Sequence, residues 1–339
     1  MNKRRTSLFF FLLSMLFFYI PLVILIVYSF NDGKSMVWKE FSFRWYKDLF
    51  MYSDNIWKAF RFSILIAILS GIISTLIGTL GAIGLQWYDF KGKKALQILT
   101  YIPLVILIVY SFNDGKSMVW KEFSFRWYKD LFMYSDNIWK AFRFSILIAI
   151  LSGIISTLIG TLGAIGLQWY DFKGKKALQV LTYVPLVIPE IILGVSLLIL
   201  FATIKFELGL TTIFIAHTTF NIPFVLFIIL SRLEEFDYSI VEAAYDLGAT
   251  EMQTLLKVVI PAILPGIISG FLIAVTLSFD DFVTTFFVAG PGSSTLPLRI
   301  YSMIRLGVSP VVNALSVLLI GISIILTLST KSLQKYLIK

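Results

Sequence analysis

Long apolar stretches separated by charged segments recur from one end of this chain to the other. An α-helix needs about 20 mostly apolar residues to cross the hydrocarbon core of a bilayer. The composition agrees, because 58% of the 339 residues are hydrophobic and 14% are charged, whereas a soluble domain has about 45–50% and about 25%. We therefore expect an all-α integral membrane protein. A soluble enzyme, a disordered chain and, since there is no cysteine, a disulfide-stapled secreted domain are excluded.

Eight of these stretches qualify as membrane spans. The first follows three basic residues and is too long for the core of a signal peptide, so we expect a retained anchor. Without the repeat described next, six spans would remain. The eight cover residues 7–30, 63–87, 95–112, 145–169, 177–204, 210–230, 264–289 and 311–328.

Residues 19–97 recur without a single change as residues 101–179, at an offset of 82. The internal repeats of solenoids and transporters resemble one another only weakly, so an identical copy, loops included, indicates a recent copying event. Two origins fit it: a sequencing, assembly or cloning artefact, and a genuine duplication. Taking 82 from 339 residues leaves a single-copy chain of 257.

The repeat suggests a division into a first span pair, its copy and a larger core. The corresponding ranges are 1–100, 101–182 and 145–334, and the core includes a polar loop at 232–262. We expect the second copy of the span pair, 101–169, to pack against the core, because its connection to the core is shorter.

Charge distribution favours a cytoplasmic N-terminus. The positive-inside rule gives most weight to short loops beside the spans. With an even number of spans, the C-terminus is then cytoplasmic as well. The basic residues that fit this orientation are Lys3, Arg4, Arg5, Lys91, Lys93, Lys94, their copies Lys173, Lys175 and Lys176, and Lys331 and Lys335 in the C-terminal tail.

Small residues form stripes along some predicted helices. Ser74, Gly78 and Ala82 lie four residues apart, and so do the members of a second stripe in the 264–289 span. Such stripes let helix backbones approach closely in lipid, so we expect both to be packing faces. The second stripe consists of Gly266, Gly270, Ala274 and Ser278.

The most informative polar stretch is the loop between the sixth and seventh spans. It reads VEAAYDLGAT at 241–250 and LLKVVIP at 255–261. Glycine supports a sharp turn and proline interrupts a helix. We expect a cytoplasmic pair of helices, with a break at Gly248 and a second, amphipathic helix that ends at Pro261.

The spacing within this loop resembles the EAA loop of ABC-importer permeases. Glu-Ala-Ala begins at Glu242, a glycine follows six residues later, and Ile-Pro begins twelve residues beyond that glycine. The resemblance implies a type I ABC-importer permease bundle in which this loop docks on a cytoplasmic ATPase. The coupling residues it implies are Glu242, Ala243, Ala244, Asp246, Gly248 and Pro261.

A second set of motifs resembles the permease subunits of spermidine/putrescine importers. They lie at 277–282, 290–291, 296–303, 307–310 and 313–315. The resemblance implies a multi-pass permease of the bacterial inner membrane, surrounded by lipid. Its partners would be an ABC ATPase dimer that binds ATP and Mg, a second permease subunit and an extracytoplasmic polyamine-binding protein. No cofactor in this chain and no nucleic acid is implied. The identical repeat departs from the family pattern.

Three acidic residues lie at or near membrane depth. Asp280 and Asp281 fall inside the 264–289 span, and Glu190 follows Pro189. Ionisable groups at this depth are costly and usually face a cavity or a partner helix. We hypothesise that they line the path of a polycationic substrate; the alternative is hydrogen bonding to neighbouring helices. Because adjacent helical residues point about 100° apart, both aspartates face one path only if the helix unwinds.

His217 is the only histidine. We expect it to be hydrogen-bonded between helices rather than to carry protons, and we expect no metal site. The chain also has no phosphate-binding loop, because the Gly-Lys-Ser at Gly33 lacks the earlier glycine of that motif. Since no nucleophile and base can be paired either, we expect a transporter subunit with no catalytic residues.

Other functions remain open on the sequence alone. The EAA loop is shared by permeases for many small solutes, so the cargo could differ. A secondary transporter or channel would have similar spans but no partner ATPase. A chain made non-functional by the rearrangement is the third alternative.

Overall fold

The computed structural model describes residues 15–16, 18–33, 38–87, 101–115, 119–169, 175–305 and 310–337. In these residues the regular elements are helices, beside an isolated bridge between Asn113 and Phe123. The chain forms two compact units. We call Met1–Lys39 with Asn137–Ser302 the core unit, and Glu40–Asp136 with Met303–Lys339 the second unit.

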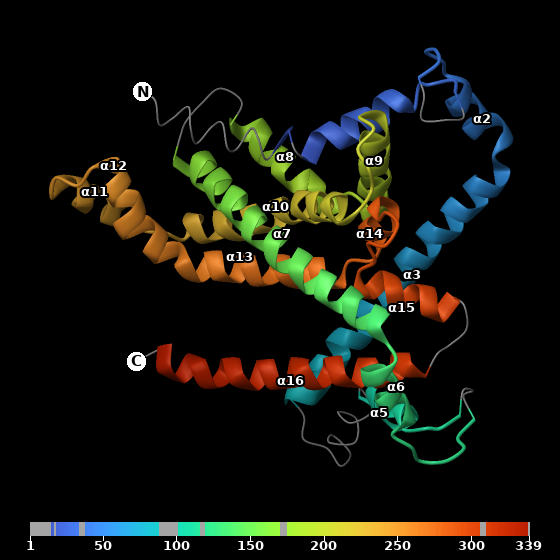
Figure 1. Cartoon of the computed structure of the whole chain (residues 1–339). Coiled ribbons are helices and arrows are strands. Elements are labelled where there is room, and N and C mark those ends of the chain that lie inside the picture. The colour runs from blue at the N-terminus through green and yellow to red at the C-terminus, as the bar shows by residue number, and fades with distance from the viewer. Residues whose placement is uncertain are drawn as a thin grey trace. The chain divides into compact units, whose positions relative to one another are not determined.

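The core unit holds most of the helices that are discussed below (Figure 1). Its first helix is Phe18–Tyr28. The others are α7 (Asp136–Trp169), α8 (Lys175–Val187), α9 (Glu190–Thr203), α10 (Leu210–Glu234), α11 (Ser239–Asp246), α12 (Glu251–Thr254), the π-helical turn η1 (Leu255–Val259), α13 (Ile260–Asp280), α14 (Val283–Val288) and the beginning of α15 (Leu296–Arg305).

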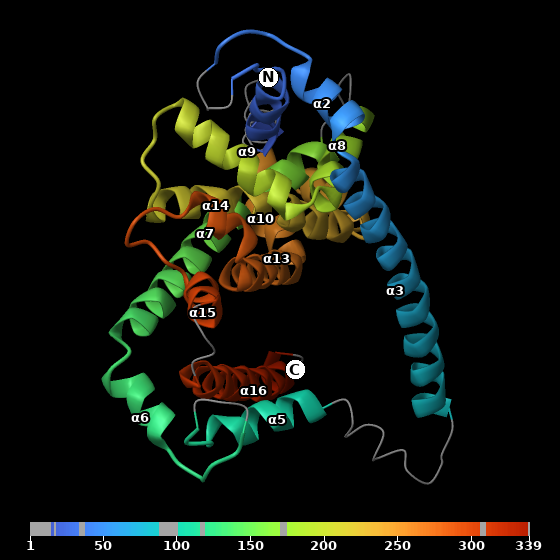
Figure 2. The same cartoon turned by 90° about the vertical axis from the view of Figure 1, so that its right-hand side faces the viewer.

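The second unit contains α2 (Arg44–Tyr52), α3 (Asp54–Trp87), α5 (Ile102–Ser111), α6 (Arg126–Met133) and α16 (Val311–Leu337). Here α16 packs against both α5 and α6 (Figure 2). The indole nitrogen of Trp127 on α6 donates a hydrogen bond of 2.7 Å to the Asn113 carbonyl, which ties α6 to the segment after α5.

Among the described residues, four helices are long and apolar enough to cross a membrane: Asp54–Gly84, Asp136–Trp169, Leu210–Glu234 and Glu251–Asp280. The bent pair α8 and α9 would be a fifth, and three shorter apolar helices are Phe18–Tyr28, Ile102–Ser111 and Val311–Ile324. The helical membrane class is therefore confirmed. The count of six or eight spans stays a prediction, as does the division into 1–100, 101–182 and 145–334. The basic residues predicted at 3–5, 91–94 and 173 lie outside the described residues.

The predicted span 177–204 is not one straight helix. It divides into α8 and α9, which meet at an angle of 101°. Pro189 stands at the junction with extended backbone (φ −56°, ψ 132°), and α9 begins at Glu190. Because proline has no N–H, the helical hydrogen-bond ladder is interrupted there.

The predicted span 264–289 was wrong at both of its ends. The helix begins well before it, at Glu251, and runs through Pro261 to Asp280. The expected stop at Pro261 is absent because this proline occupies the first turn of α13, directly after η1. A π-helical turn shifts the hydrogen-bond pattern, and a first-turn proline needs no N–H partner. At the other end, extended backbone at Asp281 (ψ 123°) separates α13 from α14.

Close helix packing organises the core unit. The packing face predicted on α13 is confirmed, since its buried residues are Ile263, Gly266, Gly270, Ala274 and Ser278. α13 packs along α10, and a Cβ added to Gly270 would lie 3.2 Å from Val225 Cγ1. The glycine is what lets the two backbones approach this closely.

The two copies of the repeat fold alike locally. The side-chain oxygen of Asn31 accepts bonds of 3.2 and 2.8 Å from the amides of Gly33 and Lys39, and Asn113 repeats both with Gly115 and Lys121. Their larger placement differs. The core unit contains Phe18–Tyr28 of the first copy and α7 of the second, so the expectation that 101–169 packs there as a pair holds only for its second helix.

Gly270→Leu should lower the midpoint of thermal unfolding of the purified protein in detergent. A larger side chain must displace Val225, and overpacking of this kind costs about 1–3 kcal/mol. Gly321→Leu on the apolar helix α16 is the matched control, since a Cβ there meets nothing within 4 Å. Equal midpoints for the two variants would contradict the packing described for α13.

Candidate functional site

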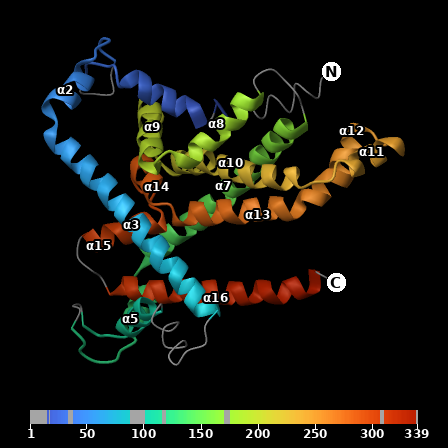
Figure 3. The ribbon, with the colours of Figure 1, turned by 180° about the vertical axis from the view of Figure 1, so that it is seen from behind.

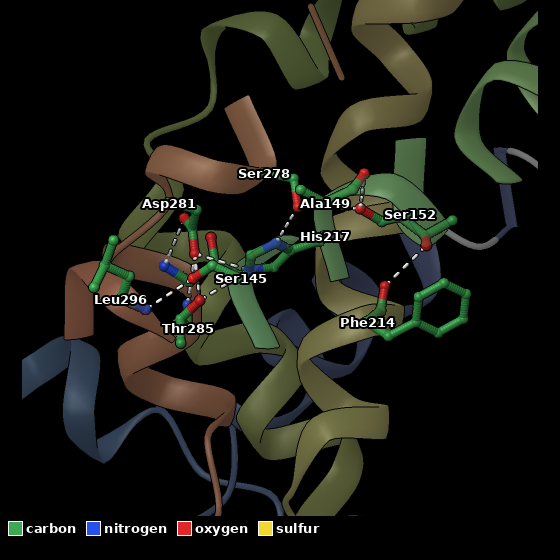
Figure 4. A network of polar contacts seen from close by, with 11 residues as sticks. Ser145, Ala149, Ser152, Phe214, His217, Ser278, Asp281, Thr285 and Leu296 are labelled. Carbon is green, nitrogen blue, oxygen red and sulfur yellow. Dashed lines mark hydrogen bonds and ion pairs between the residues drawn. The ribbon is translucent and has the colours of Figure 1, made fainter. Parts of the chain in front are cut away.

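A buried polar cluster links four helices and the break after α13 (Figure 4). Its centre is His217 on α10, which is fully buried. His217 Nδ1 lies 2.6 Å from Ser278 Oγ of α13, and Nε2 lies 2.8 Å from Thr285 Oγ1 of α14. Ser152 of α7 extends the cluster, because its hydroxyl donates to Ser278 Oγ at 3.1 Å. The interhelical hydrogen bonding predicted for His217 is therefore confirmed.

Asp281 belongs to this cluster and explains why the chain breaks there. Its Oδ2 accepts bonds of 2.8 Å from both the amide and the hydroxyl of Thr285, and its Oδ1 accepts one of 3.2 Å from the amide of Thr284. His217 Nε2 approaches the same Oδ2 at 3.1 Å. The carboxylate thus binds the free amides at the first turn of α14, which satisfies groups that would otherwise be left unpaired in an apolar setting.

These contacts are mutually consistent for a neutral imidazole. Asp281 can only accept when it is ionised, so Nε2 carries the proton and donates toward Asp281 and Thr285. Nδ1 then accepts from Ser278, whose own oxygen accepts from Ser152. Every member has a donor or acceptor role. The arrangement holds helices together and needs no proton transfer.

Asp280, the neighbour of Asp281, has a different environment. It is the last residue of α13 and its side chain is exposed. Glu190, at the start of α9, is also exposed, and the carboxylates of Asp281 and Asp280 both act on it electrostatically. Because α9 packs against α14, Glu190 begins a helix next to the segment that follows the two aspartates; of the three acidic residues, Asp281 is tied into the cluster, and Asp280 and Glu190 are exposed.

The helix pair predicted around Gly248 is present, although its second helix continues through Pro261. Glu242, Ala243, Ala244 and Asp246 are on α11, and Gly248 follows it with φ +80°, a conformation that favours glycine. Thr250 and Gln253 close the following turn with two hydrogen bonds: the backbone N–H of each residue donates to the side-chain oxygen of the other. Pro261 lies further on, at the start of α13. Figure 3 shows α11 and α12 beyond the end of α13.

The coupling loop is anchored on one side and open on the other. Val241 is buried in the same apolar cluster as Val259 and Ile263, whereas Glu242 and Ala243 are exposed and Leu247 is 89% exposed. Tyr238 lies beside Gln168 and Trp169 at the end of α7, and burial raises the pKa of its hydroxyl. At the same corner, the Ser239 amide donates to Asp237 and lowers the pKa of that carboxyl.

Sequence reasoning missed several members of the polar cluster. Ser278 was recognised only as a small packing residue, and Ser152 and Thr285 were not singled out. Ser145 was missed as well, although its hydroxyl accepts a 2.8 Å bond from the Leu296 amide at the start of α15. A usable signal would have been hydroxyl residues inside apolar spans, since each needs a partner there.

Comparison with known proteins places the chain in a family. The sequence pattern of binding-protein-dependent transport system inner membrane components matches residues 156–339, more than half of the chain. The chain belongs to this family. It is therefore a multi-pass membrane component of an ABC importer, and not an enzyme.

The sequence of this permease aligns with those of its relatives over most of their length. It is 39% identical to the spermidine/putrescine transport system permease protein PotC of Escherichia coli (strain K12), over 71% of this chain and 91% of the relative. Identity to the putrescine transport system permease protein PotI of the same strain is 41%, over 65% and 81%. A crystal structure of a bacterial ABC transporter that imports the acidic polysaccharide alginate shares its fold, with TM-score 0.56 and 17% identity over 76% and 96%.

Thr285→Val should lower the thermal unfolding midpoint of this permease. The change removes the hydroxyl shared by His217 and Asp281, and a buried polar group left without its partner costs about 1–3 kcal/mol. The adjacent Thr284→Val is the control: Thr284 is equally buried, but its hydroxyl has no hydrogen-bond partner within the described part of the chain. A loss of stability as large in the control would argue against the cluster.

Proposed function

We propose that this permease imports the polyamines spermidine and putrescine. The observation that carries the proposal is its 39% identity to PotC across 91% of that protein. The similarity to the putrescine permease PotI points to the same class of cargo. Polyamines are flexible polycations, so a path for them calls for a few carboxylates that replace lost hydration without trapping the ligand.

Asp280 and Glu190 are the residues we assign to the substrate path. Both are exposed, and they interact electrostatically with each other and with Asp281. Asp281, which was also a path candidate, is assigned to holding the path wall through its bonds to Thr285 and His217. Two open carboxylates beside a fixed one would let a passing ammonium group exchange partners.

Membership of the family supports a proposal for the remaining subunits. In this proposal the chain pairs with a second, PotB-like permease, takes substrate from an extracytoplasmic polyamine-binding protein and docks on a cytoplasmic ABC ATPase dimer. ATP and Mg bind that ATPase, and this chain holds no cofactor. Both termini are cytoplasmic. Glu242, Ala243, Ala244, Asp246, Gly248 and Pro261 transmit ATPase closure to the spans, which the anchored but open loop geometry supports.

Expression together with those partners should give ATP-dependent uptake of labelled spermidine or putrescine in cells that lack their own uptake system. Asp280→Asn and Glu190→Gln should each lower the uptake rate by about tenfold or more, without changing the unfolding midpoint, because losing a charge–charge contact of about 1.4 kcal/mol changes a rate tenfold. Asp281→Asn should instead lower the midpoint.

Glu207→Gln, at an exposed carboxylate between α9 and α10, is the control and should transport normally. Normal uptake in both path variants would refute the assigned path. An assembled complex with stimulated ATPase but no polyamine uptake would refute polyamines as the cargo and favour another small solute.

Gly248→Val should leave the complex assembled but uncouple ATP hydrolysis from uptake. Valine is strained at φ +80°, so the turn after α11 must rearrange. Gly292→Val supplies the same backbone strain elsewhere: Gly292 has φ +75°, and a Cβ meets nothing within 4 Å at either glycine. Coupled uptake by Gly248→Val, or equal uncoupling by Gly292→Val, would contradict the coupling role.

A further inference from the structure

Two helices of this chain have the same sequence and different surroundings. α3 and α7 each contain the same 34 residues. In the 18-residue apolar window of α7, 50% of the residues are buried, whereas none are in that of α3. Since sequence cannot distinguish the two helices, whatever binds one of them is chemically suited to bind the other.

The surface that receives α7 is built from α10, α13 and the start of α15. A Cβ on Gly153 would lie 2.8 Å from Val275, and one on Gly160 would lie 2.8 Å from Val225. Ser152 bonds Ser278. We call this surface, with Val225, Val275, Ser278 and the Leu296 amide, the α7 position.

The matching face of α3 is uncovered. Gly71 and Gly78 are the residues that correspond to Gly153 and Gly160, and a Cβ added to either meets nothing within 4 Å. Ser70 corresponds to Ser152, and its hydroxyl donates within its own helix turn, to the Ala67 carbonyl at 3.2 Å. Every group that α7 uses to occupy its position is therefore present on α3.

The chain can reach the α7 position by two routes of nearly equal length. In the structure the chain leaves the core unit after Lys39 and returns at Asn137. If α3 occupied the position, the chain would instead leave after α3 and return at α8. Because the copies are offset by 82 residues, both routes exclude similar lengths of chain, and loop-closure entropy changes only with the logarithm of length. Each route also leaves two apolar helices outside the core unit. The later spans therefore keep the same orientation across the membrane.

We infer that α3 and α7 of one molecule are alternative occupants of the α7 position, and that the protein populates both arrangements. The contacts made within the position are the same in each. Only the excluded helix pair differs, α3 with α5 in one arrangement and α5 with α7 in the other. The inference concerns packing alone and does not depend on the cargo.

Leucine substitutions at the paired glycines test the inference. Gly160→Leu blocks α7 but leaves α3 able to bind, so it should retain most of the wild-type yield of folded protein by size-exclusion chromatography in detergent. Gly78→Leu should do the same. The double variant should lose the folded peak. A yield for Gly160→Leu as low as that of the double variant would overturn the inference, and so would a double variant that folds like the wild type.

Cysteine crosslinking reads the two arrangements directly, because the chain has no cysteine of its own. Gly153→Cys with Val275→Cys should form a disulfide on oxidation in membranes, and so should Gly71→Cys with Val275→Cys. The two crosslinked fractions should lie within about tenfold of each other. Ile73→Cys with Val275→Cys, on another face of α3, measures the background from collisions.

Linked peptides quantified by mass spectrometry distinguish the outcomes. A Gly71 signal no higher than the Ile73 background would show α7 to be the sole occupant and overturn the inference. A Gly71 crosslink found only in dimers would assign α3 to a second copy of the chain, which also overturns it. A Gly160→Leu substitution added to the Gly71 pair should raise its crosslinked fraction.

Discussion

One valine holds three helices of the core unit at their closest approach. Val225 of α10 lies between Gly160 of α7 and Gly270 of α13, and a Cβ added to these glycines would lie 2.8 and 3.2 Å from its Cγ1. Helices in lipid gain little hydrophobic free energy by meeting, so close contact between backbones takes its place. This contact sets where His217 lies, two turns earlier on α10, and where the coupling loop leaves, further along the same helix.

The polar cluster uses that close packing to separate two neighbouring aspartates. Asp281 receives four hydrogen-bonding contacts because the chain unwinds at its position, whereas Asp280 stays at the end of a regular helix and is open. A buried carboxylate already held by these contacts is a poor ligand for a mobile cation. A single break in α13 therefore gives two identical side chains different chemistry.

Much of this could be predicted from sequence, because periodic patterns report local structure. The stripe through Gly270 is readable in this way, and the interhelical role of His217 was expected from a lone polar side chain inside an apolar span. The continuation of the helix through Pro261 was not, since it depends on how the preceding turn widens. The sequence also could not predict which copy of the helix packs in the core unit. Gly78 and Gly160 have identical neighbours in sequence, so only chain connectivity and tertiary contacts can give them different surroundings.

The π-helical turn η1 stands between the coupling loop and α13. Such a turn is equivalent to one residue inserted into an α-helix, and one residue corresponds to about 100° of rotation about the helix axis. The extra residue in η1 therefore changes, by about 100° about the helix axis, the direction in which the coupling loop faces relative to the glycine stripe of α13. If η1 became an α-helical turn, the coupling loop would rotate about the axis of α13 while α13 stayed fixed against α10.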